Sequence, residues 1–273
     1  MRLHGACFLL PLAFALAGCF EPRTTEQPGA DPRLEAEVER LREVLVVGPL
    51  AAPDAGFAIA LVDEGELQWT RSFGQGIDAG QAYAVPQLAP LLLAVGLERL
   101  VDQGKLQLPD EKRRELLAAP NEAALLAAEI EKAAGKPWRE YLRQEILEPL
   151  KMAKTSLPEG AEPALESSAE DLVHLMVDLQ KVHAGRAWRR LEPAGARRLL
   201  RPLEGDRGLG LEFGGKGQSA YFLRKGRSGG HSFLFVGFVS SGNGAVIVGP
   251  SDELVDAARK VVAQTYDWPD FKG

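Results

Sequence analysis

Two groups of strand-like segments, separated by a long helical block, constrain this fold more than any other feature of the sequence. The first group is a hairpin pattern, with apolar runs at 57–62 and 67–73 on either side of Glu64-Gly65. The second group contains four short runs near the C-terminus, at 209–213, 220–225, 233–239 and 245–248. We therefore predict an α/β (α+β) fold in which one antiparallel sheet is built from both ends of the chain.

The helices are predicted from periodicity and from their start signals. Residues 88–97 are almost wholly apolar, which indicates a buried helix, and Ser251-Asp252 predicts the start of a last helix. That last helix is expected at 253–265, and further helices are expected at 121–134, 137–147, 168–184 and 193–201. We expect a sheet lobe at about 33–86 and 203–273, flanked by helices, and a helical second lobe at about 87–202.

The N-terminus predicts a lipoprotein signal peptide rather than part of the fold. Arg2 precedes an apolar stretch, Ala6–Ala17, that is too short to span a bilayer. The four residues Leu16-Ala17-Gly18-Cys19 resemble the bacterial lipobox, in which the cysteine is acylated and becomes the mature N-terminus. We expect residues 1–18 to be removed and Cys19 to hold the chain at the membrane through its lipid. The alternative is an ordinary secretory signal with a chance cysteine.

The residues after the signal predict a flexible stalk at 19–32, followed by one domain at 33–273. The stalk is polar and contains Pro22, Pro28 and Gly29. Phe20, rather than an aspartate, follows the cysteine, which favours an outer-membrane lipoprotein facing the periplasm if the host is Gram-negative. The net charge of −6, with no basic run, argues against nucleic acid as a partner.

Five segments, in the right order from about Gly56 to the C-terminus, resemble the β-lactamase-related and penicillin-binding serine hydrolases. They are "LVDQGKL" (100–106), "AAEIEKAAGKPWREYLRQEILEPLKMAKTS" (127–156), "SSAEDL" (167–172), "RGLGLEFGG" (207–215) and "GRSGGHSFLFVGFVS" (226–240). The resemblance implies the fold of class C β-lactamases and DD-peptidases. It also implies a cleft in which active relatives carry a Ser-x-x-Lys pair, a Tyr-x-Asn loop and a Lys- or His-x-Gly strand.

The Ser-x-x-Lys pair is absent from the whole chain. Counting back from Gly104, the resemblance places the nucleophilic serine at Gln87 and the lysine at Pro90. Glutamine has no nucleophilic oxygen, and proline carries no charge and no proton to exchange. The resemblance therefore implies a hydrolase scaffold without acylation chemistry.

The other two elements are also altered. The Tyr-x-Asn loop falls on Ala118 and Pro120, and a shift by one residue recovers Asn121 but still leaves Ala119 for the tyrosine. The strand motif falls on three residues, Arg227-Ser228-Gly229, where arginine keeps the positive charge with a different shape. The candidate ligand-binding residues are therefore Arg227, Ser228, Gly229 and Asn121. Alternatively, Arg227 pairs with a nearby acid.

No metal or cofactor is expected. His174 and His183 lie nine residues apart on one predicted helix, hence on opposite faces, and His231 has no local reason to meet Ser228. We expect an envelope lipoprotein that is inactive as an enzyme and whose cleft binds a peptidoglycan-like peptide or serves as a protein scaffold. The alternatives are an active serine hydrolase (β-lactamase, esterase or D-peptidase type) with relocated catalytic residues, and a structural assembly subunit that binds nothing in the cleft.

Overall fold

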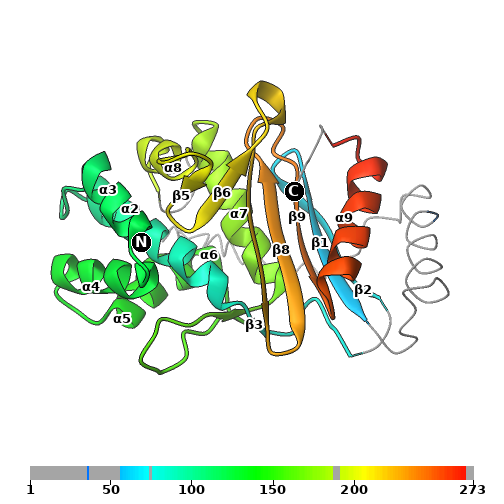
Figure 1. The fold of residues 1–273 in the computed structure, drawn as a ribbon, viewed down its shortest axis with the longest axis horizontal. Coiled ribbons are helices and arrows are strands. Elements are labelled where there is room, and N and C mark those ends of the chain that lie inside the picture. The colour runs from blue at the N-terminus through cyan, green and yellow to red at the C-terminus, as the bar shows by residue number, and fades with distance from the viewer. Residues whose placement is uncertain (1–35, 37–55, 74–75, 187–190, 269–273) are drawn as a thin grey trace, which may run out of the picture. The chain divides into compact units, whose positions relative to one another are not determined.

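The strands from the two ends of the chain join in one seven-stranded antiparallel sheet, as the sequence predicts (Figure 1). The strand order is β2-β1-β9-β8-β7-β6-β5, so the N-terminal hairpin pairs with the last strand of the chain. The strands are β1 (Phe57–Asp63), β2 (Glu66–Phe73), β5 (Arg207–Gly208), β6 (Leu211–Gly214), β7 (Tyr221–Ser228), β8 (His231–Phe238) and β9 (Gly244–Gly249).

This computed structural model describes residue 36 and residues 56–73, 76–186 and 191–268. The predicted signal peptide, the predicted lipidation site Cys19 and the predicted stalk lie outside the described residues.

The first hairpin has the turn that its sequence indicates. Glu64 and Gly65 both adopt positive φ, 50° and 76°, in the two-residue turn between β1 and β2. Such a turn matches the right-handed twist of the strands, and it needs left-handed backbone at both central positions.

Both faces of the sheet are covered. Along β1, Ala58, Ala60 and Val62 belong to the larger apolar core, whereas Phe57, Ile59 and Leu61 belong to a second cluster. Helix α7 (Ala169–His183) packs on the first face and helix α9 (Asp252–Thr265) on the second (Figure 1). The caps are as expected for such helix starts, because the Ser168 and Ser251 side chains accept hydrogen bonds from the first turns of α7 and α9.

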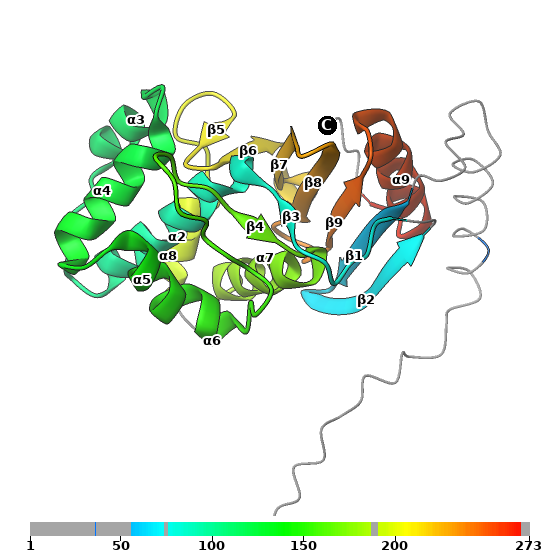
Figure 2. The ribbon, with the colours of Figure 1, turned by 90° about the horizontal axis from the view of Figure 1, so that it is seen from below.

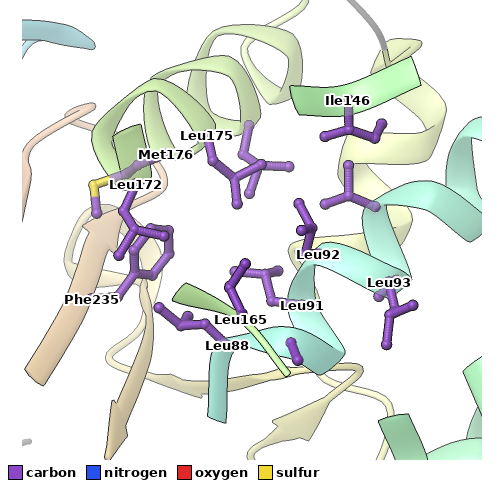
Figure 3. Packing of buried hydrophobic residues seen from close by; sticks show 14 of the residues in the cluster. Leu88, Leu91, Leu92, Leu93, Ile146, Leu165, Leu172, Leu175, Met176 and Phe235 are labelled. Atoms are coloured by element: carbon purple, nitrogen blue, oxygen red, sulfur yellow. The ribbon is translucent and has the colours of Figure 1, made fainter. Parts of the chain in front are cut away.

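A buried helix, α2 (Ala89–Asp102), runs through the larger core. It follows a short 3-10 turn, η2 (Pro86–Leu88), so Pro90 lies in its first turn, where a proline breaks no hydrogen bond. Figure 3 shows Leu88 and Leu91 on the side of Leu172 and Phe235, whereas Leu93 points away from them.

The other helices lie to one side of the sheet (Figure 2). One of them, α3 (Asp110–Ala118), is absent from the sequence prediction, because Arg113, Leu116 and Leu117 are its only buried residues and give it a narrow apolar face. The remaining elements are α4 (Glu122–Ala134), α5 (Trp138–Leu142), the π-helical turn η3 (Arg143–Leu147), α6 (Glu148–Leu150), α8 (Pro193–Leu199), the 3-10 turn η4 (Gly217–Ser219) and a two-stranded sheet of β3 (Tyr83–Ala84) and β4 (Glu166–Ser167).

A buried ion-pair network ties α2 to α3 and α8. The Glu98 carboxylate, 1% exposed, accepts hydrogen bonds from Arg113 at 2.7 and 2.9 Å and from Arg198 at 2.7 Å. Arg198 also donates to Asp102 at 2.7 Å. With both arginines paired, the buried carboxylate is fully compensated.

Candidate binding cleft

A cleft of about 570 Å³ lies where η2, the junction of α3 with α4, and strand β7 meet. It is lined by Pro86, Gln87, Pro90, Leu117, Ala118, Ala119, Pro120, Asn121, Glu122, Ala123, Glu162, Arg207 and Arg224. Five positions that the family resemblance selected from separate parts of the sequence are among them: Gln87, Pro90, Ala118, Pro120 and Asn121. None of the described residues that line the cleft is a serine, threonine or cysteine.

Gln87 bridges the start of the central helix and strand β7. Its Nε2 donates a hydrogen bond to the backbone carbonyl of Arg227 at 3.1 Å. Its Oε1 is buried and has no hydrogen-bond partner among the described residues. Gly226 permits this approach, because a Cβ at that position would lie 2.5 Å from the Cδ of Gln87. The amide thus occupies the space between the helix and the strand.

The strand beside Gln87 is open at its edge. Strand β6 pairs with β7 only from Tyr221 to Leu223, so the following residues of β7 have no strand neighbour on that side within the described chain. A hydrogen bond from Arg224 Nε to the Gln87 carbonyl, at 2.9 Å, adds a second link between β7 and η2. The partly exposed Arg224 side chain lines the cleft and approaches Glu212, with Nη1 3.6 Å from Oε1.

Arg227 lies elsewhere than the sequence reasoning expected. Its carbonyl faces Gln87, but its side chain lines a separate groove with Asp252 and Asp256, on the α9 side of the sheet. The cause is strand alternation, since neighbouring residues point to opposite faces. Arg224 lines the cleft, and a Cβ on Gly226 would point at Gln87, so the segment with a positive residue two positions before a glycine is Arg224-Lys225-Gly226 here. That pattern was visible in the sequence, three residues before the one chosen.

Ser228 and Gly229 also have a different setting from the one that the resemblance implies. Gly229 and Gly230 have φ of 58° and 80° and form the two-residue turn between β7 and β8. Ser228 consequently lies directly opposite His231 in the strand register, a pairing that the spacing of the two residues alone did not indicate. The His231 ring packs against Tyr83, with centroids 5.0 Å apart, and no side-chain hydrogen bond joins Ser228 to His231 in the described structure.

The charges in the cleft are balanced. Arg207 and Arg224 contribute two positive side chains, and Glu122 and Glu162 two negative ones. Glu122 Oε1 accepts a hydrogen bond from the Gly210 backbone at 3.1 Å. Burial raises the pKa of the Glu122 carboxyl, and the Gly210 hydrogen bond and the two arginines oppose that rise. Perturbed acids in clefts are typical of functional sites.

Within the described ranges, no three histidine, cysteine or acidic side chains are grouped as metal ligands would be. None of the described helices has the length and apolar character required to cross a membrane.

Comparisons with known proteins show a likeness at the level of the fold. No family model matches the sequence, and no curated protein matches it. Solved structures do match. The octameric penicillin-binding protein homologue from Pyrococcus abyssi superposes with a TM-score of 0.68 at 16% identity, covering 83% of this chain and 77% of that one.

SurE is similar as well. Its crystal structure gives a TM-score of 0.66 at 16% identity, covering 86% of this chain and 76% of SurE. SurE with D-Leu gives a TM-score of 0.63 at 17% identity, covering 85% of this chain and 76% of SurE. At these identities the likeness shows the fold, a mixed α/β architecture around one antiparallel sheet.

Proposed function

We propose that this chain binds a carboxylate-bearing peptide in the cleft without forming an acyl-enzyme. The observation that carries the proposal is the place of Gln87 and Pro90. Both line the cleft where the resemblance puts nucleophile and base, and neither side chain can attack a carbonyl or take up a proton in that role. The Gln87 amide is engaged with the β7 backbone.

Size and charge support a small ligand. A cleft of about 570 Å³ is in the range of small-molecule sites. Arg224 and Arg207 present guanidinium groups, which suit a carboxylate because of their planar fork of donors. SurE, a protein of similar fold, was crystallised with D-Leu, an amino acid with a free carboxylate. We therefore favour a short peptide containing D-amino acids, of the kind found in peptidoglycan.

The proposed cellular setting follows from the N-terminal motif. Cys19 would carry the lipid, and the domain would lie on the periplasmic face of the outer membrane in a Gram-negative host. Cys19→Ser should release a folded protein into the soluble fraction, measured by fractionation and immunoblotting. A variant that stays with the membrane would contradict the anchor. The alternative partner is an envelope protein, for which this domain would serve as a scaffold.

The absence of acylation is tested with a fluorescent penicillin and a fluorophosphonate probe. The purified full-length protein should remain unlabelled before and after heat denaturation. Ser228 beside His231 is the arrangement that favours the rival, an active hydrolase with relocated residues. Labelling that disappears in Ser228→Ala would refute the proposal and assign the nucleophile.

Binding is tested by the thermal shift that D-leucyl-D-leucine or a soluble muropeptide produces, because a ligand of the folded state raises its stability. Arg224→Gln should remove the shift, whereas Arg227→Gln, on the opposite face of the same strand, should keep it. The reverse result would return the ligand contact to Arg227. If no peptide changes the melting temperature, a role as a protein scaffold would explain the cleft better than peptide binding.

A further inference from the structure

Glu122 is the one acid in the cleft that the fold holds in a fixed place. It is the first residue of α4, and its Oε1 accepts the Gly210 backbone hydrogen bond at 3.1 Å. A left-handed glycine is required there, since Gly210 has φ of 68° and a Cβ would lie 2.2 Å from the Leu91 nitrogen. The turn that carries Gly210 is thus pressed against the first turn of α2, and the Glu122 carboxylate is positioned against both.

The Glu122 carboxylate is not neutralised within the structure. It makes no ion pair within 4.0 Å among the described residues, and its second oxygen makes no hydrogen bond there. Glu162, exposed at the rim of the cleft, likewise has no ion pair in the described chain. Glu122 is half-buried, and its unbonded oxygen is not among the fully buried atoms, so a positive group of a ligand could reach it.

The two arginines act on the Glu122 carboxylate only at longer range, since neither forms an ion pair with it within 4.0 Å in the described chain. Arg207 donates to the Leu117 carbonyl at 3.3 Å, and Arg224 is directed to the Gln87 carbonyl and Glu212. The cleft therefore has two positive groups and two negative groups that are not paired with each other. The net charge of the residues that line the cleft is zero, which suits a ligand carrying one charge of each sign better than a ligand carrying only negative charge.

Resting on the proposed binding function, we infer that the ligand is a zwitterionic peptide with a free primary amine, whose ammonium binds Glu122 while its carboxylate binds Arg224 and Arg207. The positive end of the α4 dipole, equivalent to about half a charge, opposes the binding of an ammonium group at Glu122. The full negative charge of Glu122 outweighs it, and Glu162 adds to the attraction. An N-acylated peptide would lose this contact and leave the Glu122 carboxylate unpaired.

The opposing account is purely structural: Glu122 serves only to hold Gly210 against α2. Glu122→Gln separates the two accounts, because the amide oxygen can still accept the Gly210 hydrogen bond while the charge is lost. Glu129→Gln is the matched control, since Glu129 is on the same helix and outside the cleft, 3.9 Å from Lys112.

The experiment is calorimetric titration of the full-length protein at neutral pH with D-leucyl-D-leucine, its N-acetyl form and its C-terminal amide. The free amine should bind about tenfold more tightly than the N-acetyl form, the size of one charge-assisted hydrogen bond. Glu122→Gln should reduce this ratio to about one, and Glu129→Gln should leave it unchanged. The amide should bind weakly to every protein.

Each outcome decides one of the two proposals. Equal binding of the free and N-acetyl peptides, both dependent on Arg224, would overturn the amine site and leave the binding function intact. A tenfold ratio that survives Glu122→Gln would place the amine elsewhere and also overturn it. If none of the three peptides binds, and none changes the melting temperature of Arg224→Gln, the proposed binding function itself would be refuted.

Discussion

A Gly226→Ala substitution tests whether the Gln87 amide fills the space between η2 and β7. The new Cβ would lie 2.5 Å from the Gln87 Cδ, and ordinary contact begins at 3.4 Å, so the amide must retreat by about 1 Å. Its hydrogen bond to the Arg227 carbonyl is already 3.1 Å long and would be broken. Losing that bond costs about 1 kcal/mol, and overpacking adds about 1 kcal/mol because a flexible side chain can move away.

The expected loss in the free energy of unfolding is therefore about 2 kcal/mol, or a melting temperature lower by about 4 to 8 °C. Gly226 does not require left-handed backbone, so the penalty depends on Gln87 alone. In a Gln87→Ala background, Gly226→Ala should be neutral or stabilise by up to about 1 kcal/mol. Urea denaturation of the four proteins measures the coupling, and Gly160→Ala, in an open loop, is the control that should show none. An equal loss in both backgrounds would refute the position of the amide.

Three further predictions follow from the surroundings of the cleft. Gly210→Ala should cost more than about 3 kcal/mol in denaturation experiments, because the new Cβ meets the Leu91 backbone and the residue has positive φ. Glu98→Ala should cost about 3–5 kcal/mol, because it leaves Arg113 buried without its partner, and a loss below 1 kcal/mol would contradict the buried network. Glu122→Gln should stabilise the protein at pH 7 but not at pH 4. Wild type loses stability as pH rises from the ordinary value of 4.5 through the raised folded pKa, which melting curves at the two pH values can test.

The sheet and its hairpins could be predicted because their signals are local. The Glu64-Gly65 turn and the apolar runs beside it fix where β1 and β2 begin and end, and the same holds for the buried helix α2. Strand β1 and helix α2 bury most of their residues, so their patterns are dense, whereas β2 has no fully buried residue and is located by the turn that precedes it. Helix α3 buries only one side and offers a pattern too sparse to recognise. Its last residue, Ala118, nevertheless lines the cleft.

The cleft could be predicted only in part. The resemblance supplied positions along the chain, and five of them meet in one place. The resemblance could not show to which face of the sheet each β7 side chain points, because a shift of one residue along a strand moves every side chain to the opposite face. Arg224 was therefore missed in favour of Arg227. Glu122 and Arg207 were missed because their role depends on the approach of distant segments, which leaves no local pattern.

The buried Oε1 of Gln87 has no hydrogen-bond partner among the described residues, which bears on how the proposed ligand would enter the cleft. A buried acceptor without a partner costs about 1–3 kcal/mol, which more than offsets the hydrogen bond that Nε2 gains. An apolar residue would stabilise the fold better, so the amide at this position is not explained by stability. Its effect is to occupy the open edge of β7, where an extended peptide would otherwise add as a strand. If the proposed ligand binds, it would enter from the side of the α3–α4 junction, between Arg207 and Glu122, and its charged ends rather than its backbone would be recognised.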